Sequence, residues 1–191
     1  MSKDIETKHL KTRWIHLFNN HMHKFFIDKN VLDIGCLDGY SSYQFVKHNA
    51  KSVIGIDIEP KYIEEAKLEY TDITFKIQDA ETIKIDYFDD IDVISCLGLI
   101  YLLNDPIKFL NTLSIQNKAN IVIIETVYNN FINYDNNGFY FLNTDVIKKI
   151  FIENNWNISL EKRFKIKDIS HQINENINFA NRIVLVFERL S

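Results

Sequence analysis

The chain has 191 residues, of which 46% are hydrophobic and 25% are charged, an ordinary composition for a globular protein. Its formal net charge of −4 argues against a DNA-binding surface, which would need a clustered basic face. No run of about 18 apolar residues is present, and the opening MSKDIETKHLK lacks an apolar leader. We therefore expect a cytoplasmic protein that does not span a membrane.

Residues 1–29 predict an amphipathic helix laid on a sheet, because apolar residues recur at steps of three and four. The apolar positions are Leu10, Trp14, Leu17, Phe18, Met22 and Phe25. Lysines and histidines lie between them, which indicates a solvated face, with contact to phosphates as the alternative. A zinc site is disfavoured because His16 and His23 share a helix face that His21 does not.

From residue 30 to 125, apolar runs alternate with helical patterns. Strands are expected at 30–34, 52–57, 73–77, 91–96 and 120–125, and helices at 40–49, from Pro60, and at about 105–113. This alternation predicts an α/β, doubly wound, Rossmann-like fold with a parallel sheet and helices on both faces. We expect residues 30–125 to be the cofactor-binding half of a single domain spanning 1–191.

Residues 126–191 follow a different pattern and are expected to form the acceptor side. Aromatic residues crowd 128–142, a helix is expected at 143–154, and strands are expected at 156–165 and 182–189. No linker rich in proline, glycine or serine separates this part from the rest. The aromatic stretch is a candidate lid over a bound acceptor.

The ten residues VLDIGCLDGY, Val31 to Tyr40, are the most informative stretch of the chain. A buried strand ends in a loop that holds Gly35 and Gly39, and a helix follows at once. Such a turn brings a nucleotide-like ligand against the backbone. Asp57 ends the next apolar run, 22 residues beyond Gly35, where an acid that binds a ribose is expected.

The same loop excludes two common nucleotide fingerprints. Leu37 and Tyr40 occupy the second and third glycine positions of G-x-G-x-x-G, which disfavours a nicotinamide oxidoreductase. No Lys-Ser or Lys-Thr pair follows the loop, as a Walker motif requires. Asp33 and Asp38 bracket the turn and would repel a phosphate but suit a cation. S-adenosylmethionine combines adenosine with a cationic half and carries no phosphate.

Four stretches resemble the class I S-adenosylmethionine-dependent methyltransferases. VLDIGCLDGY is similar to their glycine loop, VIGIDIEP (53–60) to the ribose segment, FKIQDAET (75–82) to the adenine segment, and DVISCLGLIYLLNDP (92–106) to the motif that ends the fourth strand. The resemblance implies S-adenosylmethionine as cofactor. It also implies a mostly parallel seven-stranded sheet whose final strand is antiparallel.

The resemblance assigns roles to individual residues. It places Asp57 on the ribose hydroxyls, Ile58 against adenine, and Asp79 and the Ala80 N–H on the adenine edge. The cofactor-binding residues that it implies are Asp33, Gly35, Cys36, Leu37, Gly39, Asp57, Ile58, Asp79, Ala80 and Cys96, with no metal ligand among them. Because strands 30–34 and 91–96 are expected to be neighbours, we predict both cysteine sulfurs on one rim of the cofactor pocket, as free thiols.

The stretch LGLIYLLNDP is close to one branch of the family, which includes enzymes similar to the tRNA wobble-uridine carboxymethyltransferases. That branch has a histidine where this chain has Leu102. Tyr101 and Glu125 remain as candidate catalytic residues. We expect methyl transfer to a small-molecule or sugar-like acceptor. An RNA-modifying methyltransferase and a non-catalytic, cofactor-binding partner subunit are the alternatives.

Overall fold

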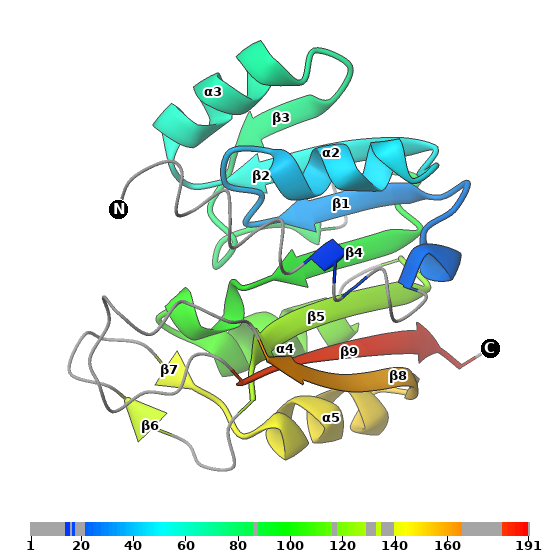
Figure 1. Cartoon of the computed structure of the whole chain (residues 1–191). Coiled ribbons are helices and arrows are strands. Elements are labelled where there is room, and N and C mark those ends of the chain that lie inside the picture. Colours follow the sequence, from blue (N-terminus) through cyan, green and yellow to red (C-terminus); the bar gives the residue numbers. More distant parts are fainter. Residues whose placement is uncertain are drawn as a thin grey trace.

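The computed structural model describes residues 14–15, 17, 22–85, 88–115, 118–128, 133–134, 140–165 and 181–190. Its centre is a seven-stranded sheet with the order β3-β2-β1-β4-β5-β9-β8 (Figure 1). The strands are β1 (Asn30–Ile34), β2 (Ser52–Asp57), β3 (Thr74–Ile77), β4 (Val93–Leu97), β5 (Ile121–Val127), β8 (Trp156–Lys165) and β9 (Asn181–Arg189). Strands β1 to β5 pair in parallel, whereas β9 is antiparallel to both of its neighbours. The predicted fold class is confirmed.

Helices cover both faces of this sheet (Figure 1). They are α2 (Tyr40–Lys47), α3 (Pro60–Glu69), α4 (Pro106–Ile115) and α5 (Thr144–Glu153), with the short 3₁₀ helices η1 (Met22–Phe25) and η3 (Ile100–Leu102). The expected helix over 1–29 falls largely outside the described residues, apart from helical positions 14, 15 and 17 and η1. None of the helices in the described part has the length and apolar character that a membrane crossing requires.

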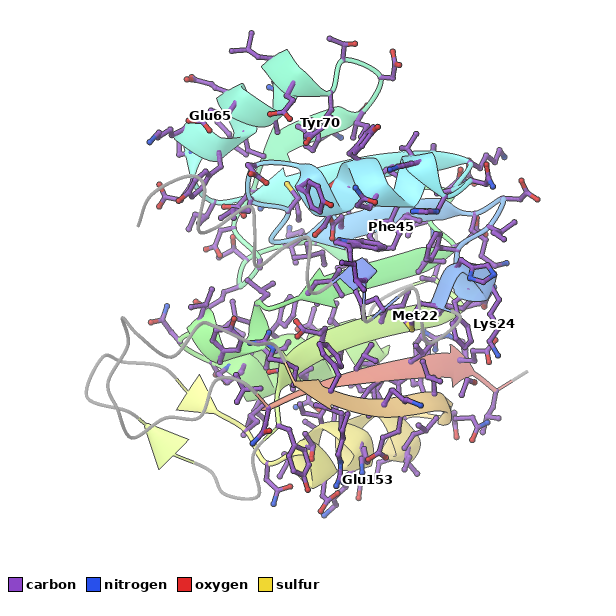
Figure 2. All side chains as sticks on the ribbon, viewed as in Figure 1. Met22, Lys24, Phe45, Glu65, Tyr70 and Glu153 are labelled. Carbon is purple, nitrogen blue, oxygen red and sulfur yellow. The ribbon has the colours of Figure 1, made fainter. Side chains whose placement is uncertain are left out.

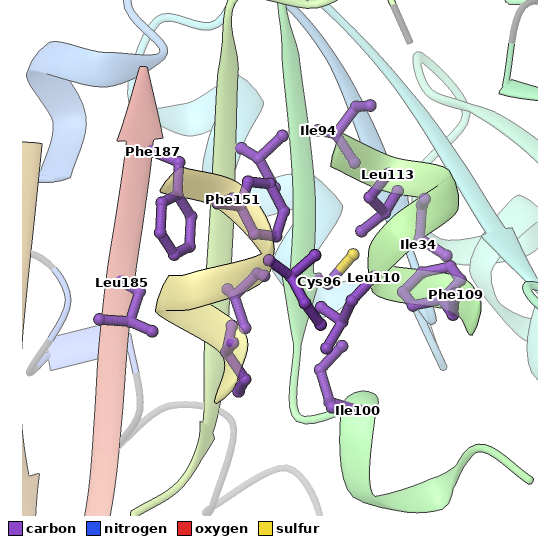
Figure 3. Packing of buried hydrophobic residues seen from close by; sticks show 14 of the residues in the cluster. Ile34, Ile94, Cys96, Ile100, Phe109, Leu110, Leu113, Phe151, Leu185 and Phe187 are labelled. Atoms are coloured by element: carbon purple, nitrogen blue, oxygen red, sulfur yellow. The ribbon is translucent and has the colours of Figure 1, made fainter. Parts of the chain in front are cut away.

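The sheet separates two hydrophobic cores. The α2 core lies between the sheet and α2, α3 and η1, and it contains Met22 and Phe45, both labelled in Figure 2. The α4 core lies between the sheet and α4 and α5, and Figure 3 shows part of it around Cys96. Strands β4 and β5 are buried along their whole length because helices cover both of their faces.

Parallel pairing brings the ends of β1, β2, β3, β4 and β5 to one edge of the sheet, which we call the carboxyl edge. In a doubly wound sheet this edge binds the ligand. Strand β8 runs parallel to β5, so its end also reaches the carboxyl edge. The two-residue strands β6 (Asn133–Tyr134) and β7 (Tyr140–Phe141) pair with each other after β5. The rest of the proposed lid at 128–142 lies outside the described residues, apart from 128 and 142.

Candidate functional site

The glycine loop between β1 and α2 is tied to the neighbouring strand. The N–H groups of Gly35 and Cys36 both donate to the Ile56 carbonyl, at 2.8 and 3.0 Å. Gly35 has φ +77°, and a Cβ there would lie 3.1 Å from the Leu99 side chain. A side chain at position 35 would therefore be strained and would crowd the chain segment that follows β4.

Gly39 is required for a different reason. It precedes α2 with φ +82°, and a Cβ would lie 2.7 Å from the Phe75 ring and 2.9 Å from the Ala66 Cβ. The close approach of α2 to β3 and α3 thus depends on the absence of a side chain. The dinucleotide fingerprint assigns such packing to its third glycine, which falls at Tyr40, whereas this chain achieves it one residue earlier.

Leu37 takes the backbone conformation of a glycine. Its φ is +51°, in the left-handed region that costs a non-glycine residue about 1–2 kcal/mol. Its N–H donates to Asp57 Oδ2 at 2.9 Å, which holds the loop against the end of β2. The turn expected at the second glycine position therefore forms around a leucine, and a hydrogen bond from β2 offsets part of the strain.

Asp57 stands at the carboxyl edge with part of its carboxylate in use. Oδ2 accepts from Leu37, and Oδ1 accepts from the Glu59 N–H at 3.0 Å. A carboxylate offers about four acceptor positions, so it has the capacity for two further donors such as ribose hydroxyls. The next residue, Ile58, leaves 57% of its surface exposed, an apolar side chain suited to a flat base.

The segment after β3 is bound to both neighbouring loops. The Gln78 N–H donates to the Asp57 carbonyl at 2.9 Å, and Asp79 Oδ1 accepts from the Glu81 N–H at 2.8 Å. Asp79 and Ala80 are half-buried beside this turn. Their backbone is therefore placed next to Asp57, as the predicted adenine segment requires.

Glu81 braces the segment after β3 against the loop that begins α4, a role that the sequence did not reveal. Its two carboxylate oxygens accept from the Asn104 side-chain amide and the Asp105 N–H, both at 2.7 Å. Burial works against the charged form, but the hydrogen bonds from Asp105 and Asn104 outweigh it and lower the pKa of the Glu81 carboxyl.

Asp33 lies beneath α2 instead of at the edge. Its side chain is 1% exposed, and Oδ2 accepts from the Ser42 hydroxyl at 2.8 Å. On the same face, Ser95 pairs with Asp33 in register, and its hydroxyl oxygen is buried without a hydrogen-bond partner in the described part of the chain. Asp33 thus anchors α2 behind the glycine loop, and its predicted contact with the cofactor stays a prediction.

The positions of the two cysteines contradict one prediction. Strands β1 and β4 are neighbours and both thiols are free, as predicted. The sulfurs, however, do not share a rim: Cys36 packs in the α2 core and Cys96 in the α4 core, on opposite faces of the sheet. Figure 3 shows Cys96 near Leu110 of α4. Burial, followed by the nearby carboxylates of Asp33 and Asp57, raises the pKa of the Cys36 thiol.

The candidate catalytic residues Tyr101 and Glu125 are brought together by a third residue, Arg182 of β9. Its guanidinium makes two contacts with the Glu125 carboxylate, Nε to Oε1 at 2.5 Å and Nη2 to Oε2 at 2.7 Å. Nη1 donates to the Tyr101 hydroxyl at 3.4 Å. Burial alone would lower the pKa of Arg182, but Glu125 and Tyr101 outweigh it and raise the pKa, so the guanidinium stays charged.

This arrangement fits S-adenosylmethionine at the carboxyl edge. The glycine loop is tied through Gly35 and Cys36 to the end of β2, Asp57 offers acceptors for two hydroxyls, and Ile58 offers an apolar surface for a base. In the residues that the structure describes, no group of three or more His, Cys, Asp or Glu side chains could hold a metal ion.

Comparison with known proteins agrees with this geometry. A family model described as a methyltransferase domain matches residues 27–178. The chain belongs to this methyltransferase family. It has the fold of S-adenosylmethionine-dependent methyltransferases: the enzyme from Mesorhizobium loti superposes with a TM-score of 0.71 at 15% identity, covering 93% of this chain and 98% of that one. Magnesium protoporphyrin IX methyltransferase from Synechocystis with bound cofactor gives 0.65 at 18% identity, covering 97% and 79%.

Curated relatives of this methyltransferase support the branch expected from its fourth-strand motif. The tRNA U34 carboxymethyltransferase of Campylobacter jejuni subsp. jejuni serotype O:2 is 36% identical over 105 residues, 52% of this chain and 36% of that protein. The corresponding protein of Nautilia profundicola is 34% identical over 107 residues, 52% of this chain and 35% of that protein. The matched part is thus about a third of the length of these relatives.

Proposed function

We propose that this methyltransferase binds S-adenosylmethionine through Asp57, Ile58, the glycine loop and the Asp79–Ala80 backbone. The observation that carries the assignment is the position of Asp57, whose carboxylate holds the glycine loop and keeps acceptor capacity at the carboxyl edge. The bound cofactor would supply an activated methyl group on a sulfonium. The remaining task of the protein is to orient the acceptor and exclude water, which can supply roughly 7–11 kcal/mol of the barrier.

We further propose a small molecule as the methyl acceptor. The support is the apolar character of the edge around η3, where Leu102 is 55% exposed in place of the histidine of the related branch, and Leu99 lies against Gly35. The cation that contacts Tyr101, Arg182, is already paired with Glu125. An acceptor with a soft or already acidic nucleophile needs no strong base at such an edge.

RNA is the second candidate. The relatives named above are tRNA-modifying enzymes, and the guanidinium of Arg163 lies 4.0 Å from the centre of the Tyr128 ring near the end of β8. Such a pair of an arginine and an aromatic ring is suited to stack on a base or to contact a phosphate.

Two measurements test these proposals in turn. Calorimetry with S-adenosylhomocysteine tests the cofactor site, and we expect saturable binding to one site per chain with no binding of NADH. Transfer of labelled methyl from S-adenosylmethionine to a panel of phenols, amines and thiols is then compared with transfer to bulk tRNA. Label in the tRNA alone, combined with an affinity for tRNA that falls steeply with salt, would reject the small-molecule acceptor in favour of RNA.

A further inference from the structure

Three side chains from distant segments meet on one face of the carboxyl edge. Glu125 stands in β5, Arg182 in β9, and Tyr101 in η3, which follows β4. Glu125 and Arg182 are 0% and 2% exposed. The Arg182 guanidinium also lies 5.2 Å from the centre of the Tyr101 ring. One cation thus contacts both the hydroxyl and the ring of Tyr101 while a carboxylate holds it in place.

Stability alone does not account for this pair. Removing two ions from water costs several kcal/mol each, and well-packed apolar residues of similar volume are often as stable or more stable. The neighbours in the sheet are already apolar, since Val184 pairs with Glu125 and Ile183 follows Arg182 in β9. What an apolar pair could not provide is the contact with Tyr101.

We propose that Arg182 is a positioning residue, which Glu125 fixes by its carboxylate and which in turn fixes Tyr101 at the acceptor side of the methyl-transfer site. The proposal rests on the function proposed above. Glu125 is then a counter-ion and does not serve as a proton acceptor, because both of its oxygens are engaged by the guanidinium. This revises its place as a candidate catalytic residue.

The chemistry of the guanidinium sets the direction of the Tyr101 hydroxyl. Arginine has only donors, so the Tyr101 oxygen accepts the hydrogen bond and the phenolic proton points away from Arg182. Tyr101 is therefore oriented as a donor toward a group other than Arg182.

The test is ¹⁹F NMR of the full chain with 3-fluorotyrosine at position 101, recorded with and without S-adenosylhomocysteine. Glu125→Leu/Arg182→Met removes the ion pair and keeps apolar bulk. Arg182→Lys keeps the charge but loses the planar fork that serves Glu125 and Tyr101 together, so it covers the case in which the double variant does not fold. In both variants we expect a moved or broadened Tyr101 resonance, with the affinity for S-adenosylhomocysteine within about twofold of the unmodified chain.

The matched control is Lys148→Met/Glu161→Gln, which removes a 2.9 Å ion pair between α5 and β8. It should leave the Tyr101 resonance unchanged. A Tyr101 resonance that stays identical to that of the unmodified chain in Arg182→Lys would overturn the positioning role, even if the cofactor binds. Absence of S-adenosylhomocysteine binding in the unmodified chain would instead refute the proposed function, and the ligand-free spectra would still decide the positioning role.

Discussion

Replacing Asp57 by alanine should weaken cofactor binding and should also destabilise the glycine loop. The substitution removes the acceptors for the Leu37 and Glu59 N–H groups, at 2.9 and 3.0 Å, and those available to a ribose. Loss of the charge-assisted bonds to two hydroxyls should weaken binding by about 1.5–3 kcal/mol, roughly 10- to 150-fold in Kd. Loss of the two backbone contacts should lower the free energy of unfolding by about 1–2 kcal/mol.

Calorimetry with S-adenosylhomocysteine and urea denaturation measure the two effects on the same protein. Asp57→Asn keeps one carbonyl oxygen and should give an intermediate loss of affinity. Asp72→Ala is the matched control, because Asp72 is exposed in the turn before β3, at the opposite end of the sheet, and its loss should change neither quantity. An unchanged affinity in Asp57→Ala would show that Asp57 does not hold the ribose.

Glu125→Gln should lower the free energy of unfolding by about 3–5 kcal/mol in urea because it leaves the buried Arg182 charge without its counter-ion, and a loss below about 1 kcal/mol would show that the pair is solvated. Gly39→Ala should lower the free energy of unfolding by about 2–4 kcal/mol, because residue 39 has a positive φ and its new Cβ would overlap Phe75 and Ala66. An unchanged Tm would contradict this. Ser95→Ala should be neutral or stabilising by up to about 1 kcal/mol in the same urea assay, since it removes a buried hydroxyl that has no hydrogen-bond partner among the described residues, so a clear loss would reveal a contact for that hydroxyl. Burial, followed by the charges of Lys47 and His23, lowers the pKa of His48 in the folded chain. Near pH 6 the unfolded chain therefore binds more protons than the folded chain. The free energy of unfolding should fall as the pH drops below about 6.5. In His48→Asn the urea midpoint should depend less on pH in this range. An equal slope of the midpoint against pH in both proteins would refute the assignment to His48.

The sequence predicted those parts of the site whose residues follow each other closely in the chain. The β1 run, the two glycines and the acid at the end of β2 follow each other within a βα unit, and parallel pairing places them together. Asp57 could therefore be located from its spacing to Gly35 alone. The antiparallel β9 followed from the resemblance to a known fold.

Contacts between distant segments were not predictable in this way. Arg182 reaches Glu125 across 57 positions of sequence, and the register of β9 on β5 decides that they meet. No periodic pattern encodes that register, because residues 121–124 of β5 and 183–187 of β9 are buried and apolar on both faces of the sheet. The bracing by Glu81 depends likewise on how two loops come together after folding.

The error over Cys96 has the same origin. In a strand with one solvated face, alternation of polar and apolar residues shows which side chains point inward. Strand β4 is covered on both faces, so Ile94 and Cys96 on one side look like Val93 and Leu97 on the other. The sequence placed the strand correctly, but its pattern carried no information on the face.

A crystal structure of the complex with S-adenosylhomocysteine would show where the cofactor binds. We predict density for the ligand at the carboxyl edge, with both ribose hydroxyls on the Asp57 carboxylate, adenine between Ile58 and the Asp79–Ala80 backbone, and the sulfur on the side of Tyr101. Ligand density at any other edge of the sheet, or a ribose that does not touch Asp57, would contradict it.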